Sequence, residues 1–170
     1  YIVVFAALHP CVFVSKEEIE EWPVVGWMTT MCGTVYVARG HGGSAMKARR
    51  AMQSVLNAGL PLVFFPEGTT TDGSTLLKFH SGLLAQVMAG GAPVTAAHVG
   101  YSIGAGNGAD VSVANDVCYW GDAKIVPHIF GLLGLRGVRV DVRFAERPIA
   151  FSSAALNRKD AAAEARAAVL

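Results

Sequence analysis

A carboxylate and several hydroxyls directly follow a short apolar run and form the first candidate site. The run is Leu60–Phe65, and the residues after it are Pro66, Glu67, Gly68, Thr69, Thr70 and Thr71. Glu67 can accept hydrogen bonds from a substrate or orient a cation, Gly68 lets a ligand approach the backbone, and Thr69 can donate to an oxygen. An ordinary polar turn, in which Glu67 serves a helix cap, explains these residues equally well.

A second candidate is the arginine that ends the run Gly33–Arg39, just before the glycine-rich stretch 40–43. A guanidinium at a strand end beside a flexible loop is well placed to bind a phosphate with two hydrogen bonds. Taken alone, Arg39 is better interpreted as a solvated residue, because most charged side chains are exposed. In a third segment, Pro93 indicates the edge or the start of a strand, and His98 is interpreted as a packed histidine rather than a base.

The elements that would position these residues alternate between strands and helices. Strands are predicted at Cys11–Val14, Gly33–Arg39, Leu60–Phe65, Pro93–Tyr101, Val111–Ala114 and Val138–Phe144. Helices are predicted at Lys16–Cys32 (in two pieces), Ser44–Ala58, Ser81–Ala89, Ile125–Leu135 and Ser153–Leu170. This alternation predicts one α/β domain over residues 1–170, with a largely parallel central sheet flanked by helices. Active sites in such domains lie at the carboxyl ends of the strands.

Composition narrows the class of protein. Hydrophobic residues make up 52% of the 170 residues and charged residues 16%, yet no apolar run approaches the length of about 20 residues that spans a bilayer. A globular domain that touches a membrane without crossing it fits this composition, and so does a well-buried core. The net charge of +1 argues against a nucleic-acid partner. The three widely spaced cysteines indicate reduced thiols and no metal cluster.

The candidate segments together resemble the lysophosphatidate acyltransferases, also called the phospholipid/glycerol acyltransferases. That family has four ordered blocks: H-x-x-x-x-D, a G-x-x-F-x-x-R-like block, F-P-E-G-T, and a V-P-[IV]-x-P-like block. The second block is matched by Gly33, Tyr36 and Arg39, the third by Phe65, Pro66, Glu67, Gly68 and Thr69, and the fourth partly by Pro93 and Val94. Upstream, Val14–Ile19 and Trp22–Gly26 are similar to the family's "K-x-E-l…P-x-x-G" stretch.

The chain departs from the family pattern at two points. Thr70 replaces the arginine that usually follows E-G-T, and Thr69–Ser74 is similar to the branch that acylates lyso-ornithine lipids and other lysolipids. The segments Tyr119–Asp122 and Pro127–His128 are also similar to that branch. None of the five histidines begins an H-x-x-x-x-D block. Because the chain opens without Met inside an apolar run, we expect that it is truncated. In the family the H-x-x-x-x-D block lies just before an apolar stretch like Ile2–Leu8, so the resemblance implies that this block lies upstream of Tyr1.

The resemblance implies transfer of a fatty acyl group from acyl-CoA or acyl carrier protein to the hydroxyl of a lysolipid, without a cofactor or metal. The upstream histidine would be the general base, so the chain alone is expected to be inactive. Arg39, Glu67, Gly68 and Thr69 would bind the acceptor head group, supported by Gly33, Tyr36, Pro66, Thr70 and Pro93. The family also implies a membrane-associated protein on the cytoplasmic face.

Two other functions remain open from the sequence. A non-catalytic module that binds lipid or phosphate would use the same fold and the same polar residues. A nucleotide-binding domain is suggested by the G-x-G-x-G run at 104–108, but no helical pattern follows it, so the dinucleotide fingerprint fails.

Overall fold

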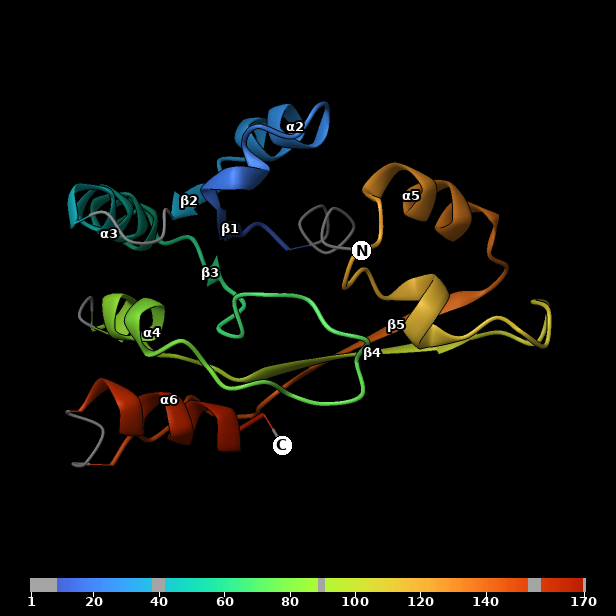
Figure 1. The fold of residues 1–170 in the computed structure, drawn as a ribbon. Helices are drawn as coiled ribbons and strands as arrows, with labels where there is room; N and C mark the ends of the chain where they lie inside the picture. Colours follow the sequence, from blue (N-terminus) through green and yellow to red (C-terminus); the bar gives the residue numbers. More distant parts are fainter. Residues whose placement is uncertain (1–8, 38–41, 89–90, 153–156, 170) are drawn as a thin grey trace. The chain divides into compact units, whose positions relative to one another are not determined.

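The computed structural model describes residues 9–37, 42–88, 91–152 and 157–169 (Figure 1). Contacts divide the chain into two units. The first unit contains residues 1–66 and 82–92, and the second contains residues 67–81 and 93–170.

The first unit is built on a parallel sheet in the order β2-β1-β3. Strand β1 (Val12–Lys16) lies in the middle, between β2 (Val35–Val37) and β3 (Leu62–Val63). Val14 pairs with Val35, and Val12 pairs with Leu62. The side chains of Val12, Val14 and Val35 are buried, so the sheet supplies part of the core of this unit.

Helices flank this sheet. A short 3₁₀ turn (Glu17–Ile19) and helix α2 (Val25–Met31) connect β1 to β2, and α3 (Gly42–Asn57) connects β2 to β3. Helix α3 packs on β2 and β3, and buries Ala48 and Met52, which lie one turn apart on one face. Helix α4 (Ser81–Met88) buries Leu84 and Val87.

Glycines end two of these helices. After α2, Gly33 has φ +73°, its N–H donates to Thr30 O (3.0 Å), and the Thr34 N–H donates to Thr29 O (3.1 Å). This pair of bonds is a Schellman motif, which needs a residue in the left-handed region. Gly59 ends α3 in the same way, with φ +75°. Gly33 is therefore a helix cap rather than the first strand residue that we predicted.

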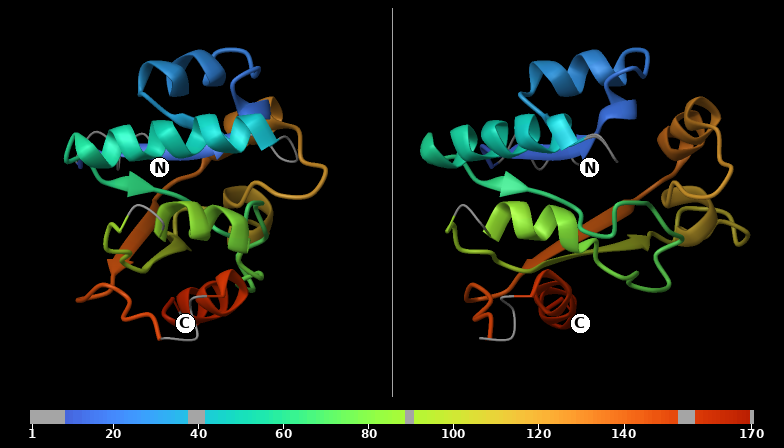
Figure 2. Two further views of the ribbon diagram at one scale, coloured as in Figure 1. Left: turned by 90° about the vertical axis from the view of Figure 1, so that its left-hand side faces the viewer. Right: turned by 60° about the vertical axis from the view of Figure 1, so that its left-hand side comes forward.

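The second unit contains an antiparallel pair of strands, β4 (Ala97–Ile103) and β5 (Val138–Phe144) (Figure 2). Their register runs from Ala97 opposite Phe144 to Ile103 opposite Val138. Helix α5 (Ile125–Gly134) precedes β5, and α6 (Arg158–Ala167) follows it. Asn157 caps α6 by accepting a hydrogen bond from Lys159 N (3.0 Å), and α6 buries the side chains of Ala161, Ala162 and Ala165.

The prediction of one largely parallel sheet is confirmed for three strands and wrong for two others. β4 and β5 pair antiparallel with each other and, in the described residues, join no parallel strand. The alternation of Val138–Phe144 is typical of an antiparallel sheet with one solvated face, whereas parallel strands tend to be apolar throughout. The strand predicted at Val111–Ala114 is wrong: residues 111–112 are not in a strand, and the next two begin a π-helical turn, Val113–Val117. That the chain forms one domain over 1–170 stays a prediction.

Candidate functional site

The predicted site residues belong to different units, and one lies outside the described residues. Gly33, Tyr36 and Pro66 belong to the first unit. Glu67, Gly68, Thr69, Thr70 and Pro93 belong to the second. Arg39 falls in the segment 38–41, outside the described residues, so its role stays a prediction from the sequence.

Glu67 shapes the loop in which it lies. Its side chain is half-buried, and its Oε2 accepts a hydrogen bond from the backbone N–H of Leu77 at 2.7 Å. Next to it, Gly68 has φ +64°, a conformation that suits glycine. The alternative that Glu67 caps a helix is wrong for this bond, because Leu77 lies in a loop. The hydrogen bond closes a loop, because Glu67 and Leu77 are ten positions apart in the chain, and the carboxylate has one further oxygen, Oε1.

The tip of this loop is a tight turn held by its own polar groups. Asp72 Oδ1 accepts from Ser74 N (3.0 Å) and Ser74 Oγ (2.7 Å), and these bonds lower the pKa of Asp72. Gly73 has φ +82°, and its N–H donates to Thr71 Oγ1 at 3.2 Å. Asp72 and Gly73 therefore form a tight turn at this end of the loop. Thr69 and Thr70 are exposed beside it, so their hydroxyls are accessible to a ligand.

Arg166 of helix α6 holds the other side of the loop, and our sequence analysis missed it. Its Nε donates to Leu77 O at 2.9 Å, and a terminal guanidinium nitrogen donates to Leu76 O at 2.6 Å. The available signal was the position of Arg166 four residues after Ala162, which places it near the buried alanine face of α6.

Tyr36 and Gly33 of the second motif support helix α2. The Tyr36 hydroxyl lies 2.7 Å from Thr29 Oγ1 and 2.9 Å from Thr30 Oγ1, and it donates to Gly26 O at 3.3 Å. With Gly33 capping the same helix, the motif ties α2 to the strand that leads toward Arg39. Gly33 and Tyr36, two of the three residues of this motif, therefore have a structural role at helix α2.

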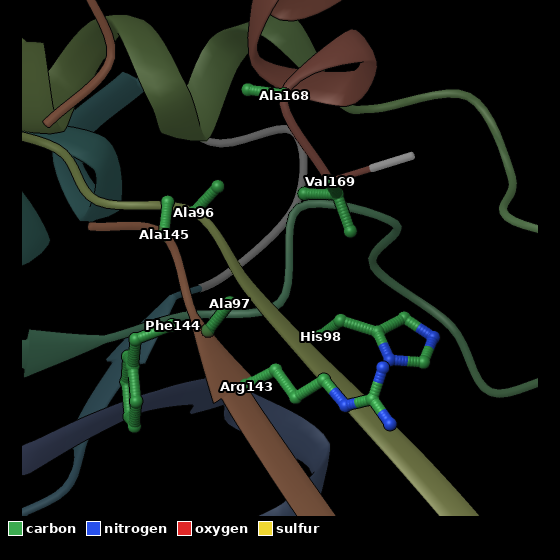
Figure 3. A pocket seen from close by; sticks show the side chains of 8 residues that line it. All are labelled: Ala96, Ala97, His98, Arg143, Phe144, Ala145, Ala168 and Val169. Atoms are coloured by element: carbon green, nitrogen blue, oxygen red, sulfur yellow. The ribbon is translucent and has the colours of Figure 1, made fainter. Parts of the chain in front are cut away.

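Two further sequence predictions need correction. Pro93 does not start a strand, because β4 begins at Ala97; Val94 O nevertheless accepts from Ile149 N at 2.8 Å. His98 is exposed rather than packed, and it pairs across the strands with Arg143. Figure 3 shows these two side chains on one side of an open pocket whose other lining residues are Ala96, Ala97, Phe144, Ala145, Ala168 and Val169.

The glycine-rich run 104–108 also has a structural explanation. Gly104 N donates to Gly137 O at 2.8 Å, and a Cβ on Gly104 would lie 3.0 Å from that oxygen. The Asn107 amide bridges the two segments: its Oδ1 accepts from Arg136 N (2.6 Å), and its Nδ2 donates to the carbonyls of Gly104 and Arg136. These glycines allow close approach of two backbones, so the geometry gives no support to a nucleotide site here.

The described residues contain neither a candidate metal site nor a helix that could span a membrane. No group of three or more His, Cys, Asp and Glu side chains there could hold a metal ion. No helix there has both the length and the apolar character needed to cross a bilayer.

Comparisons with known proteins agree with these motifs. Residues 1–100 match the Acyltransferase family. The lyso-ornithine lipid O-acyltransferase of Pseudomonas aeruginosa is 34% identical over 99% of this chain and 61% of that protein. The Brucella abortus protein of the same name is 32% identical over 93% of this chain and 61% of its own length. The 1-acyl-sn-glycerol-3-phosphate acyltransferase of Neisseria gonorrhoeae is 35% identical over 59% of this chain and 39% of that protein.

The chain therefore belongs to the Acyltransferase family, as its motifs predicted. It spans about three fifths of the length of the first two relatives, at 61% of each. No solved structure matches the chain significantly, so the glycerolipid acyltransferase fold stays a prediction.

Proposed function

We propose that the protein containing this chain transfers a fatty acyl group from an acyl thioester to the free hydroxyl of a lysolipid. The observation that carries the proposal is the F-P-E-G-T segment, whose glutamate is fixed by its loop while Thr69 and Thr70 stay exposed. Similarity over nearly the whole chain to proteins named lyso-ornithine lipid O-acyltransferase supports it.

In the proposed reaction, the acceptor hydroxyl attacks the thioester carbonyl. A C–O bond forms, the C–S bond breaks, and the hydroxyl proton passes through a base to the departing thiolate. The family resemblance assigns the base to an H-x-x-x-x-D histidine, which these 170 residues do not contain. The residues of this chain would act by orientation, with Arg39 and the Glu67–Thr69 loop binding the acceptor head group. The donor would be acyl-CoA or acyl carrier protein, and the reaction needs no cofactor.

We further propose that the acceptor has a less anionic head group than lysophosphatidate, such as lyso-ornithine lipid or a lysophosphodiester. Thr70 is exposed in the loop beside Glu67 and replaces the family's usual arginine there. One fewer cation weakens binding of a phosphomonoester dianion, which relies on several positive partners. The two relatives that match more than nine tenths of the chain are also named for lyso-ornithine lipid.

Competition between two acceptors tests this proposal. The natural protein that contains the chain is given lyso-ornithine lipid and lysophosphatidate at equal concentration, with an acyl thioester, and both products are measured. We expect lyso-ornithine lipid to be preferred, and Thr70→Arg to shift the ratio toward lysophosphatidate. Thr75→Arg is the matched control, because Thr75 is an exposed threonine of the same loop. A preference for lysophosphatidate that Thr70→Arg leaves unaltered would refute the proposed acceptor class.

The main alternative is a non-catalytic module that binds lipid or phosphate. Release of free thiol from the acyl thioester, measured with and without added lysolipid, separates the two functions. An acyltransferase should release more thiol when lysolipid is added. Saturable lysolipid binding with no release of free thiol by the natural protein would favour the binding module. The 170-residue chain by itself is expected to bind acceptor but to turn over at background, because general-base catalysis contributes about 10²–10⁴-fold.

We also propose that the protein contacts the cytoplasmic face of a membrane, where its lipid substrate resides. Helix α5 supports this, because Val126, Ile129, Phe130 and Leu133 are 60%, 38%, 71% and 75% exposed and share one face at helical spacing. Sedimentation with anionic vesicles tests it. We expect Phe130→Ser with Leu133→Ser to reduce vesicle binding, and Val142→Ser, an exposed apolar residue of β5, to leave it unchanged. Equal binding by all three proteins would exclude α5 as the contact.

A further inference from the structure

One backbone residue joins helix α6 to the proposed acceptor site. The N–H of Leu77 donates to Glu67 Oε2 (2.7 Å), while the carbonyl of the same residue accepts from Arg166 Nε (2.9 Å). The second guanidinium bond, to Leu76 O at 2.6 Å, holds the preceding peptide as well. Leu77 therefore lies between the glutamate and the arginine and is hydrogen-bonded to both.

The bonding of Arg166 is directed at this backbone. Among the described residues Arg166 forms no salt bridge; the salt bridge there joins Arg139 to Asp141. Both hydrogen bonds that it makes there go to consecutive carbonyls of the loop. The guanidinium is a rigid planar fork, so two bonds to adjacent peptides fix their position and orientation together. Arg166 is half-buried, which limits competition from water.

Helix α6 has anchors that do not involve this arginine. It buries Ala161, Ala162 and Ala165, and both carboxylate oxygens of Glu164 accept hydrogen bonds from Ser152. The helix should therefore stay in place when Arg166 is replaced, while the loop loses its restraint. This separation makes the role of Arg166 testable.

We propose that Arg166 is a positioning residue for the acceptor site: by holding Leu76 and Leu77, it keeps the Glu67 carboxylate in the place where it binds the acceptor head group. The proposal rests on the proposed function, because it assigns the Glu67 loop to the acceptor. Arg166 acts through the backbone of the loop and does not itself contact substrate.

The first experiment measures kinetics of the natural protein that contains this chain. Arg166→Ala should raise the KM for the lysolipid acceptor about 5- to 20-fold, with the KM for the acyl thioester unchanged within about two-fold, because orientation of one substrate is lost. Arg166→Lys should restore part of the loss, since Lys keeps a donor but not the fork. Arg158→Ala, on an exposed residue of the same helix, is the matched control and should leave both constants unchanged.

Two variants separate positioning from general damage to α6. Glu164→Gln weakens the contact of the helix with Ser152 and leaves the Arg166 bonds in place, so the acceptor KM should stay within about two-fold of the unmodified protein. In a Glu67→Ala background, Arg166→Ala should add less than about two-fold, because the carboxylate that it positions is gone. Fully additive effects, or an equal loss in Glu164→Gln, would overturn the proposal.

The second experiment does not depend on activity. Amide hydrogen exchange of residues 67–80 should be about 10-fold faster in Arg166→Ala than in Arg158→Ala. Leu77 should be the most affected, because its N–H, which donates to Glu67, shares a peptide group with Leu76 O, and that carbonyl loses its bond to the arginine. Unchanged exchange at Leu77 would overturn the proposal even if catalysis changed. If the unmodified protein shows no acyl transfer, the proposed function fails, and faster exchange in Arg166→Ala would still establish the restraint on the loop.

Discussion

Among the glycines of the first unit for which the structure shows the surroundings of an added Cβ, Gly26 is the one that would meet the closest atoms. It is buried in α2, in the stretch that resembles "P-x-x-G". An ideal Cβ there would lie 2.0 Å from Glu20 O, 2.6 Å from Glu20 C and 2.9 Å from Ile19 O. All three atoms belong to the backbone, so no side chain can rotate to relieve the overlap. The turn after the 3₁₀ segment would have to move away from α2.

The expected cost follows from this overlap. Overpacking a buried site typically costs about 1–3 kcal/mol and sometimes more, so we expect the free energy of unfolding of Gly26→Ala to fall by at least that amount. For a chain of this size, the fall corresponds to a decrease in Tm of about 2–12 °C. The control is Gly82→Ala in α4, where a Cβ meets nothing within 4 Å. This change should be neutral or stabilise the helix by up to about 1 kcal/mol.

Urea unfolding followed by tryptophan fluorescence measures both variants, since Trp22 and Trp27 flank Gly26 in the chain. Both substitutions replace glycine by alanine in a helix. If the free energy of unfolding falls in Gly26→Ala but not in Gly82→Ala, the difference is due to the close contact at Gly26 and not to the general effect of this replacement. A Gly26→Ala protein as stable as the unmodified one, or as Gly82→Ala, would refute the reasoning and would show that the turn at Glu20 moves freely.

Three further results are expected. In the natural protein, Arg39→Ala should weaken use of a phosphate-bearing acceptor about 10- to 150-fold. Arg39→Lys should recover only part of this loss, because Lys cannot form two parallel hydrogen bonds. Unchanged kinetics in both variants would show that Arg39 is a solvated residue at the end of a strand. Glu67→Gln keeps an acceptor for the Leu77 N–H and should retain the protection of the loop against hydrogen exchange, whereas Glu67→Ala should lose it. Equal protection in these two variants would show that the hydrogen bond is dispensable. Exposed Cys32 should react with iodoacetamide faster than Cys118. Burial, and to a smaller extent the charge of Asp72, raises the thiol pKa of Cys118, so less of its thiolate forms at a given pH. Faster reaction of Cys118 would contradict this prediction.

Much of the site could be predicted from the sequence because its signals are local. The F-P-E-G-T motif, its Asp72-Gly73 turn and the acyltransferase family all follow from residues close together in the chain. Helix ends are equally local: Gly59 stops α3 because a Schellman motif needs positive φ, which glycine adopts without strain. The boundaries of α5 and β5 likewise follow from apolar and alternating patterns within single segments.

Other features were decided by partners far away in the chain. Strand Pro93–Tyr101 gave no local sign that it would begin at Ala97 and pair antiparallel with Val138–Phe144, because pairing depends on which strand edge is available. The strand predicted at Gly33–Arg39 begins too early, because the two hydrogen bonds that end α2 determine the conformation of Gly33.

The restraint on the Glu67 loop shows the same division. Ten consecutive residues of the sequence are enough to predict that a glutamate, a glycine and several hydroxyls follow an apolar strand. That the glutamate is held through Leu77 by Arg166 depends on a hydrogen bond between residues 89 positions apart. Sequence periodicity places Arg166 near the inner face of α6, but only packing of that helix brings its guanidinium to these carbonyls, because a hydrogen bond needs its partners within about 3 Å.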